Sequence, residues 1–341
     1  MKKIRKILIP VLVVLLIGGA FGGYVLHELT YHPSKWLVEG DDAVPEIPFE
    51  DAINALDMMD NTWETALPQT AVYEIITDHF SSPLPEGKTE KKAIVIGYDG
   101  CRVDLFRMLA TAKRSAINTL LEDGGHAIFT YAGGVNYPAE NIQATSTAPG
   151  WCSMLTGVLS DVHHITDNGQ VKEVEPKTLL LSLVEDGMVD DSAFYVSWDG
   201  HFSKKDATYR AEKLYARDEG LNATFRRALF DPGTKFNILS DLKQKDCTDF
   251  IFSTLEYTDH EGHSTGFTPS NPKYVSAFRS AEATGADIIE TIKNRKTYNT
   301  EDWLILITTD HGGYGGGHGG PTFEERMTFI VANKDILSIA K

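Results

Sequence analysis

The chain has 341 residues, a formal net charge of −16 at pH 7 and three cysteines. This length can bury a full hydrophobic core, and it favours one large α/β domain over two equal domains. The acidic balance excludes a nucleic acid polymer as an expected partner, and three cysteines are too few for a disulfide framework.

The N-terminus has the pattern of a membrane anchor. Residues 1–6 are basic, and residues 7–26 form an uncharged, largely apolar run. About twenty apolar residues span a bilayer as a helix, whereas the core of a signal peptide is usually about 7–15 residues long. Basic residues before such a run favour a cytoplasmic N-terminus. We therefore expect a cytoplasmic segment at 1–6, a transmembrane anchor or signal-anchor at 7–26, and a single-pass cell membrane protein with an extracytoplasmic domain. Small residues near the end of the run leave cleavage open.

The next part of the chain, residues 27–91, is expected to form a stem. Prolines divide it into short pieces, and residues 49–63 and 70–80 have the spacing of short amphipathic helices. From residue 92 to 341, strand-like and helix-like patterns alternate. This alternation predicts a three-layer α/β/α fold around a mainly parallel sheet.

The expected elements of this catalytic domain follow from apolar runs and helical periodicity. Strands are predicted at 93–97, 126–131, 193–198, 249–255, 303–307 and 328–331. Helices are predicted at 103–121, 147–155, 177–185, 207–229 and 272–293.

Three of these strands are followed by residues that can bind metal ions. Asp99 follows the first strand, Asp259 and His263 follow the strand at 249–255, and Asp310 and His311 follow the strand at 303–307. In a parallel sheet the carboxyl ends of the strands share one edge, which is the usual binding edge. Mixed carboxylate and imidazole ligands suit Zn²⁺. The alternatives are a helix cap for Asp99 and ordinary polar loops for the others.

A glycine run after His311 adds His318 to the candidates. Glycines allow the backbone to fold tightly enough to bring His318 back toward the strand end.

The segment 144–157 contains a candidate nucleophile. Thr147 stands at a predicted helix start, where backbone N–H groups and the helix dipole favour a phosphate or a developing oxyanion. An alcohol becomes a competent nucleophile when coordination to a metal lowers its pKa. The alternative is an ordinary helix cap.

Together these residues resemble the alkaline phosphatase superfamily, most closely its type I phosphodiesterase/nucleotide pyrophosphatase branch. The resemblance covers residues 92–333 and is strongest at 94–100, 145–168, 257–266 and 307–320. The branch has a Thr-x-Thr-x-Pro pattern followed by Thr-Gly. Residues 145–149 (Thr-Ser-Thr-Ala-Pro) and 156–157 (Thr-Gly) match this pattern.

The resemblance implies a site with two divalent metal ions, for which ligand type favours Zn²⁺ and leaves Mn²⁺ open. It implies that one ion is held by Asp259, His263 and His318. The other ion is held by Asp99, Asp310, His311 and the oxygen of Thr147. It also implies that Thr147 is the nucleophile. Asn168 and the backbone N–H of Ala148 are then expected to hold phosphoryl oxygens.

The chain departs from the branch in several places. Gly150 and Trp151 replace the usual Asn-His, and the interval between Asp99 and Thr147 is longer than usual. Residues 169–246 have no match and are expected to build a cap that faces the substrate. These departures leave the nucleotide preference open.

The leading hypothesis is therefore a metal-dependent hydrolase of small phosphate esters that acts through a phosphothreonine intermediate. The absence of arginine between Arg114 and Arg210 favours diesters, with a phosphomonoesterase as an alternative. A sulfatase is disfavoured, because Thr147 and Trp151 occupy key positions of its Cys/Ser-x-Pro-x-Arg pattern. An envelope phospho-headgroup transferase and an inactive surface binding module are further alternatives. Membrane contact is expected through the N-terminal helix, and the sequence leaves the oligomeric state open.

Overall fold

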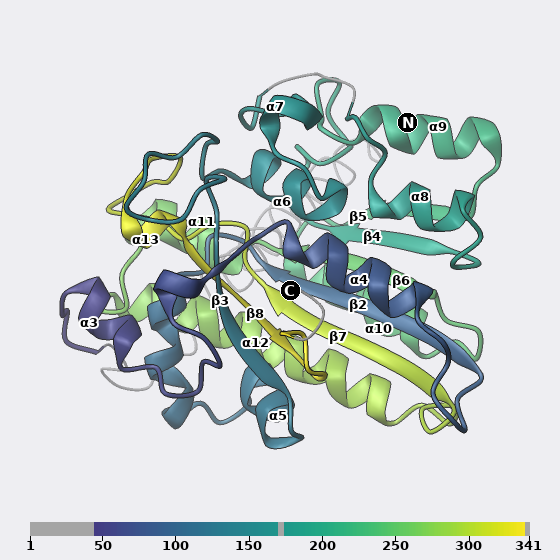
Figure 1. Ribbon diagram of the computed structural model, residues 1–341, viewed down its shortest axis with the longest axis horizontal. Coiled ribbons are helices and arrows are strands. Elements are labelled where there is room, and N and C mark those ends of the chain that lie inside the picture. The colour runs from purple at the N-terminus through teal and green to yellow at the C-terminus, as the bar shows by residue number, and fades with distance from the viewer. Residues whose placement is uncertain (1–43, 170–173, 338–341) are drawn as a thin grey trace, which may run out of the picture.

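The computed structural model describes residues 44–169 and 174–337. Its sheet has eight strands in the order β1-β3-β8-β7-β2-β6-β4-β5 (Figure 1). The strands are β1 (Leu67–Pro68), β2 (Glu90–Tyr98), β3 (His126–Tyr131), β4 (Ser192–Val196), β5 (Ala223–Arg227), β6 (Phe250–Leu255), β7 (Glu301–Thr308) and β8 (Met327–Ala332).

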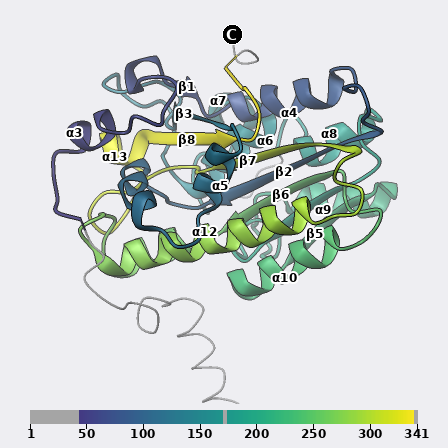
Figure 2. The ribbon, with the colours of Figure 1, turned by 90° about the horizontal axis from the view of Figure 1, so that it is seen from below.

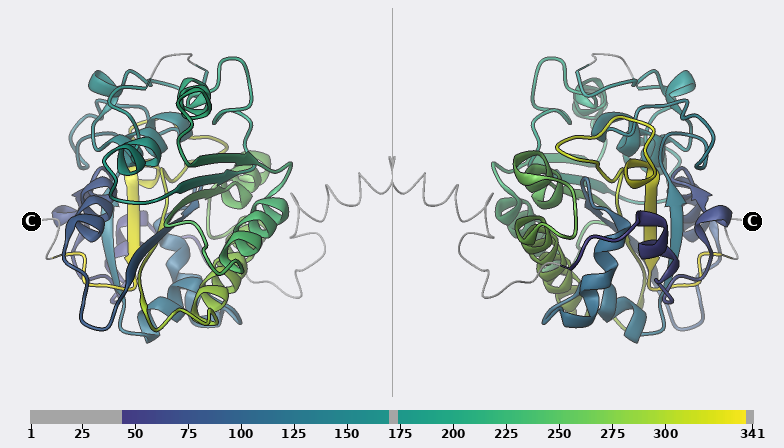
Figure 3. Two further views of the ribbon diagram at one scale, coloured as in Figure 1. Left: turned by 90° about the vertical axis from the view of Figure 1, so that its right-hand side faces the viewer. Right: turned by 90° about the vertical axis from the view of Figure 1, so that its left-hand side faces the viewer.

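Helices cover both faces of this sheet, so the predicted three-layer arrangement is confirmed (Figures 2 and 3). One face, called the α12 face below, carries α3 (Phe49–Asn54), the 3₁₀ helix η2 (Val103–Thr111), α5 (Ala116–Glu122), α10 (Asp231–Leu242) and α12 (Pro272–Lys293). The other, called the α6 face, carries α4 (Ala71–Ser81), α6 (Thr147–Thr156) and α8 (Leu179–Glu185). The remaining helices are η1 (Trp63–Thr65), α7 (Ser160–His163), α9 (Arg210–Glu219), α11 (Tyr257–Thr265) and α13 (Phe323–Arg326).

The central strands supply apolar residues to both layers because neighbouring side chains point to opposite faces. In β2, Ile94 and Ile96 belong to the core of the α12 face, and Val95 belongs to the core of the α6 face. A strand buried on both sides reads as a continuous apolar run, which is why the sequence predicts these strands well.

The sheet is mainly parallel, as predicted, and β8 is its exception. It pairs antiparallel with β3 and with β7. The link from β7 to β8 stays at the carboxyl edge of β7, whereas a parallel neighbour would need a crossover along the whole sheet. The glycine run and His318 lie in this link.

Residues 44–91 belong to the domain, so the expectation of a stem is wrong for this part of the chain. Strand β1 pairs with β3, and helix α4 buries Ile75 and Ile76 in the core of the α6 face. The apolar side of an amphipathic helix needs a surface to cover, and here that surface is the sheet. Residues 27–43 lie outside the described residues.

The expected cap at 169–246 is also corrected. Within it, β4 and β5 complete one edge of the central sheet, and β5 replaces the second half of the helix predicted at 207–229. The chain leaves α9 at Gly220, whose φ of +68° is a left-handed conformation suited to glycine. The polar edge strand that follows has little apolar periodicity from which to predict it.

The helix predicted at 103–121 is two helices, η2 and α5. Ser115 separates them, because its side chain accepts a hydrogen bond from the N–H of Asn118 and caps α5.

Within residues 44–169 and 174–337, no helix has both the length and the apolarity needed to cross a bilayer. The expected basic segment at 1–6 and anchor at 7–26 lie outside this range.

Candidate metal and phosphoryl site

Three neighbouring strands bring the predicted ligands to one edge of the sheet. The order β7-β2-β6 places Asp310, Asp99 and the α11 residue Asp259 side by side. Gly100 permits this approach, because a Cβ there would lie 2.8 Å from Asp259 Oδ1, and its φ is +62°. Its N–H also donates a hydrogen bond to Asp310 Oδ1 over 3.2 Å.

The first ligand group consists of Asp99, Asp310 and His311, all fully buried. His311 Nε2 lies 3.3 Å from Asp310 Oδ2 and 3.6 Å from Asp99 Oδ1. The Nδ1–H of His311 donates to the carbonyl of Gly312, at 2.6 Å, which fixes the tautomer. The lone pair of Nε2 therefore faces two carboxylates.

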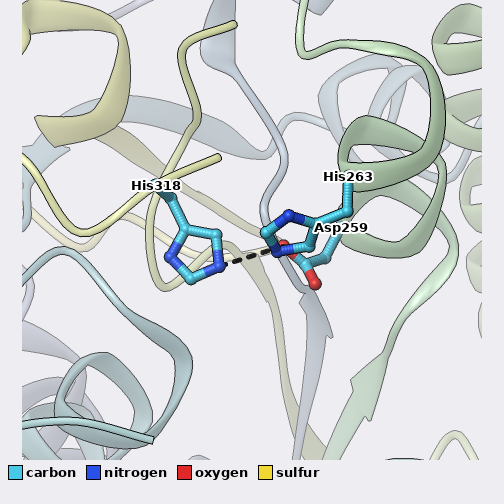
Figure 4. A group of neighbouring side chains, drawn as sticks. All are labelled: Asp259, His263 and His318. Carbon is cyan, nitrogen blue, oxygen red and sulfur yellow. Dashed lines mark ion pairs between the residues drawn. The ribbon is translucent and has the colours of Figure 1, made fainter. Parts of the chain in front are cut away.

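The second group consists of Asp259, His263 and His318 (Figure 4). Asp259 and His263 are one turn apart on α11, and His318 comes from the glycine-rich loop. Both imidazole Nε2 atoms lie 3.5 Å from Asp259 Oδ1. The Nδ1 atoms of His263 and His318 bond to the carbonyls of Gly316 (3.1 Å) and Thr145 (3.0 Å). Backbone carbonyls thus orient both rings, with each Nε2 toward Asp259.

Both groups contain buried polar atoms that lack a hydrogen-bond partner in the described structure. These atoms are Asp259 Oδ1, Asp310 Oδ2 and His311 Nε2. A buried polar group without a partner is costly, and a cation bound in each group would satisfy these atoms. The residues present therefore fit divalent metal ions.

Burial and neighbouring charges shift the pKa values of the residues in both ligand groups. Burial, and then the charge of Asp259, raise the pKa of Asp99 well above its usual range. Burial, and then Asp99, do the same for Asp310, and burial raises the pKa of Asp259 to about 7. Burial lowers the pKa of His318 to about 4, so this ring is neutral at pH 7 and can coordinate a metal ion.

Thr147 is the first residue of α6, and Ser146 stands at the cap position. The Thr147 hydroxyl lies 3.5 Å from Asp99 Oδ1, at the outer limit of a hydrogen bond. Asn168 Nδ2 lies 3.5 Å from the same hydroxyl. The structure thus brings Thr147 and Asn168 to the border of the first ligand group.

The N–H of Ala148 has a different partner from the expected phosphoryl oxygen. It donates to Asn168 Oδ1 over 2.8 Å. This bond turns the amide so that Nδ2 is directed at Thr147. In this structure, Ala148 therefore positions Asn168.

Trp151 and Gly150, which depart from the branch pattern, both support the first ligand group. The indole N–H of Trp151 donates to Asp99 Oδ2 over 3.0 Å, and the ring is fully buried. Gly150 lies against Asp310, since a Cβ at this position would be 2.9 Å from Asp310 Cβ. A side chain at position 150 would therefore push α6 away from the ligands.

Glu256 is a site residue that the sequence analysis missed. It directly follows β6, and with Asp99 and Asp259 it forms a third group of potential ligands. Burial, and then the charge of Asp99, raise its pKa well above the usual range. Its place at the carboxyl end of a strand was the signal that could have revealed it.

The second ligand group and the candidate nucleophile Thr147 open into a cleft of about 600 Å³. It is lined by Thr147, Asn168, Ser197, Trp198, Asp199, Arg227, Leu229, Phe230, Glu256, Asp259, His260, His263 and His318. Residues 197–230 in this lining come from the region expected to form a cap. That region does face the cleft, although it does so through loops at the edge of the sheet.

The chain has relatives of known family. The family model of type I phosphodiesterase/nucleotide pyrophosphatase matches residues 93–315, more than half of the chain, which confirms the resemblance inferred from the sequence. Among curated proteins, none matches this chain in sequence.

Several solved structures are similar to it. Murine ectonucleotide pyrophosphatase/phosphodiesterase 5 is 18% identical over 65% of this chain, with a TM-score of 0.45, and 57% of that protein's length is spanned. The C-terminal periplasmic domain of phosphoethanolamine transferase EptC from Campylobacter jejuni is 14% identical over 72% of this chain and 81% of its own, with a TM-score of 0.47. Alkaline phosphatase from the Antarctic bacterium TAB5 is 12% identical over 72% of this chain and 91% of its own, with a TM-score of 0.45.

Proposed function

Because the chain belongs to the type I phosphodiesterase/nucleotide pyrophosphatase family, we propose that it is a metal-dependent hydrolase of small phosphate esters. The observation that carries this proposal is the place of the Thr147 hydroxyl. It lies 3.5 Å from Asp99 Oδ1, and the same Asp99 oxygen lies 3.6 Å from His311 Nε2. A hydroxyl at the border of a cation-binding group can be activated as a nucleophile.

Each ligand group would hold one divalent ion, with Zn²⁺ favoured by the nitrogen and oxygen ligands and Mn²⁺ as the alternative. When bound, such ions lower the pKa of a coordinated hydroxyl and neutralise charge on the phosphoryl group. The buried atoms without partners in both groups support this assignment.

The reaction would proceed in two displacements at phosphorus. Thr147 Oγ1 attacks phosphorus and releases its proton to solvent, while the bond to the leaving oxygen breaks and that oxygen takes up a proton. Water then attacks the phosphothreonine, the bond from phosphorus to Oγ1 breaks, and the threonine is restored. Asn168 Nδ2, held by the N–H of Ala148, would donate to a non-bridging oxygen in both steps.

The proposal includes a single-pass location in the cell membrane with the domain outside the cytoplasm. It rests on the basic residues 1–6 and the apolar run 7–26. We expect the full chain to resist alkaline extraction from membranes. We also expect protease added to the outside of intact cells to reach the domain. Release of the chain by alkaline treatment would contradict an uncleaved anchor.

Substitution of Thr147 tests the function. We expect Thr147→Ala to abolish turnover of bis-4-nitrophenyl phosphate while elemental analysis still finds bound metal. Thr156→Ala is the matched control, because Thr156 is a buried threonine at the other end of α6 whose hydroxyl donates to Cys152 O. Full activity of Thr147→Ala would refute the nucleophile.

A substrate comparison separates the alternatives. Faster turnover of the bis-ester than of 4-nitrophenyl phosphate would support the diesterase, and the reverse order would support a monoesterase. Transfer of the phosphoryl group to an added alcohol in preference to water would indicate a transferase. If the metal-loaded protein turns over none of these esters, the inactive surface binding module is the remaining alternative.

A further inference from the structure

Arg227 is the one lysine or arginine among the described residues that line the cleft. Three carboxylates share this lining, namely Asp199, Glu256 and Asp259. One of them, Asp199, forms an ion pair with Lys204 at 2.8 Å. In residues 44–169 and 174–337, Arg227 itself has no carboxylate within ion-pair distance. Its charge is therefore available to a ligand in the cleft.

The alternation of β5 places Arg227 on the same face of the sheet as Thr147. Arg227 pairs in register with Val196, which belongs to the core of the α6 face. Arg226 pairs with Tyr195, which belongs to the core of the α12 face. Adjacent arginines thus point to opposite faces, and only Arg227 lines the cleft.

A backbone contact holds the guanidinium of Arg227 in place. Its Nε donates to the carbonyl of Ser197, the residue that follows β4, over 2.8 Å. The terminal nitrogens of the guanidinium remain as a planar pair of donors, the geometry that recognises carboxylate or phosphate.

The strand order separates Arg227 from the nucleophile. Strand β5 is three positions from β2, which carries Asp99 at its end, so the two strand ends lie about 14 Å apart at the usual spacing of strands. An arginine side chain that leans one strand inward, to Ser197, spans only part of this distance. A group bound by Arg227 is therefore distinct from the phosphoryl group that Thr147 attacks.

We propose that Arg227 is a specificity-determining residue that binds a second anionic group, carried on one ester arm of the substrate. This inference rests on the proposed function and narrows its substrate class. The substrates are phosphate diesters or anhydrides whose arm bears a carboxylate or a further phosphate. The ligand groups would hold the reacting phosphoryl group at one end of the cleft while Arg227 anchors the arm at the other end.

The test compares diesters that share 4-nitrophenol as leaving group and differ in the second arm. The arms are phenyl, carboxyphenyl and phosphonophenyl, so the last two separate carboxylate from phosphate-like recognition. In the full-length, Zn²⁺-loaded protein, we expect kcat/KM to be about tenfold higher for at least one charged arm, the size of one charge-assisted hydrogen bond. Arg227→Gln should lose this preference and keep the rate on the phenyl diester.

Two further variants control for structural effects. Arg226→Gln removes the neighbouring charge from the opposite face and should leave the preference intact. Arg227→Lys keeps the charge without the paired donors and should retain a reduced preference. An unchanged preference in Arg227→Gln, or no preference in the unsubstituted protein, would overturn the inference.

Binding measurements keep the inference testable if no diester is turned over. Calorimetric titration would compare diphenyl phosphate with carboxyphenyl and phosphonophenyl phenyl phosphate, using the Zn²⁺-loaded Thr147→Ala protein. If a charged ligand binds more tightly than diphenyl phosphate, and this difference disappears in the double variant with Thr147→Ala and Arg227→Gln, the role of Arg227 is supported even if the proposed hydrolysis fails. Equal affinities with and without Arg227 refute that role, even if hydrolysis occurs.

Discussion

The indole of Trp151 and the carboxylate of Asp99 form a buried hydrogen bond of 3.0 Å that links α6 to the end of β2. The bond engages Asp99 Oδ2 and leaves Oδ1 directed at Thr147 and His311. It also lowers the pKa of a carboxyl group that burial otherwise raises. A residue four positions after the candidate nucleophile thus sets the orientation of a candidate ligand.

Trp151→Phe should weaken metal binding while preserving most of the packing. The phenyl ring still fills much of the space, but Asp99 loses the donor that orients it. Loss of such a supporting hydrogen bond typically reduces metal affinity by about 10–100-fold. Titration of Zn²⁺ against a competing chelator measures this change.

Trp303→Phe is the matched control for that substitution. Trp303 also donates its indole N–H to a buried carboxylate, Glu301 Oε2, over 2.7 Å. Both residues lie at the amino end of β7, whereas the ligand groups lie at the carboxyl edge of the sheet. Trp303→Phe should lower the stability of the protein to a similar extent as Trp151→Phe and leave the Zn²⁺ affinity unchanged. Equal metal affinity in the two variants would contradict the role given to Trp151.

The Asp259 carboxyl should make a progressively less favourable contribution to the stability of metal-free protein as the pH rises from about 4 to about 7. The folded pKa of Asp259 is about 7, above the value of about 4 in an unfolded chain. Its stabilising contribution is complete below the unfolded value and is lost as the pH rises through the folded value. The cost is on the order of 1.4 kcal/mol for each unit of difference. Asp99 and Asp310 shift in the same direction.

Melting temperatures measured between pH 5 and 8, with chelator and with Zn²⁺, check this dependence. Relative to Asp259→Asn, the chelated unsubstituted protein should melt at progressively lower temperature, and Zn²⁺ should restore its stability most strongly near pH 8. Asp259→Asn should remove the Asp259 contribution to the pH dependence in chelator, because its amide does not titrate. If the chelated unsubstituted protein becomes more stable than Asp259→Asn as the pH rises over this range, the raised pKa assigned to Asp259 is contradicted.

Substitutions at Asn168 separate its donor from its acceptor. Asn168→Asp keeps an oxygen for the N–H of Ala148 but loses the amide donor directed at Thr147. If the donor stabilises the phosphoryl oxygens, kcat should fall by about 10²–10³-fold. Asn168→Ala should show a similar loss.

Single-turnover kinetics on bis-4-nitrophenyl phosphate provide the measurement for both variants. Near-normal rates in Asn168→Asp with a large loss in Asn168→Ala would show that anchoring Ala148 matters and that the donor does not.

The central strands, and the types of ligand that follow them, could be predicted from the amino-acid sequence. The doubly buried parts of β2 and β7, residues 93–97 and 303–307, are apolar, so the polar residues that follow these strands, Asp99, Asp310 and His311, stand out in the sequence. The chain also shows the start of α6 at Thr147 and the whole of α12, because helical periodicity is a local property.

Which of these residues come into contact depends on the order of the strands in the folded sheet. Strand order is set by packing across the sheet, and local periodicity carries no record of it. The edge strand β5 was hidden because exposure to solvent removes its apolar pattern. Trp151, Glu256 and Arg227 acquire their contacts only when distant strand ends are brought to one edge, since each contact joins segments far apart in the chain.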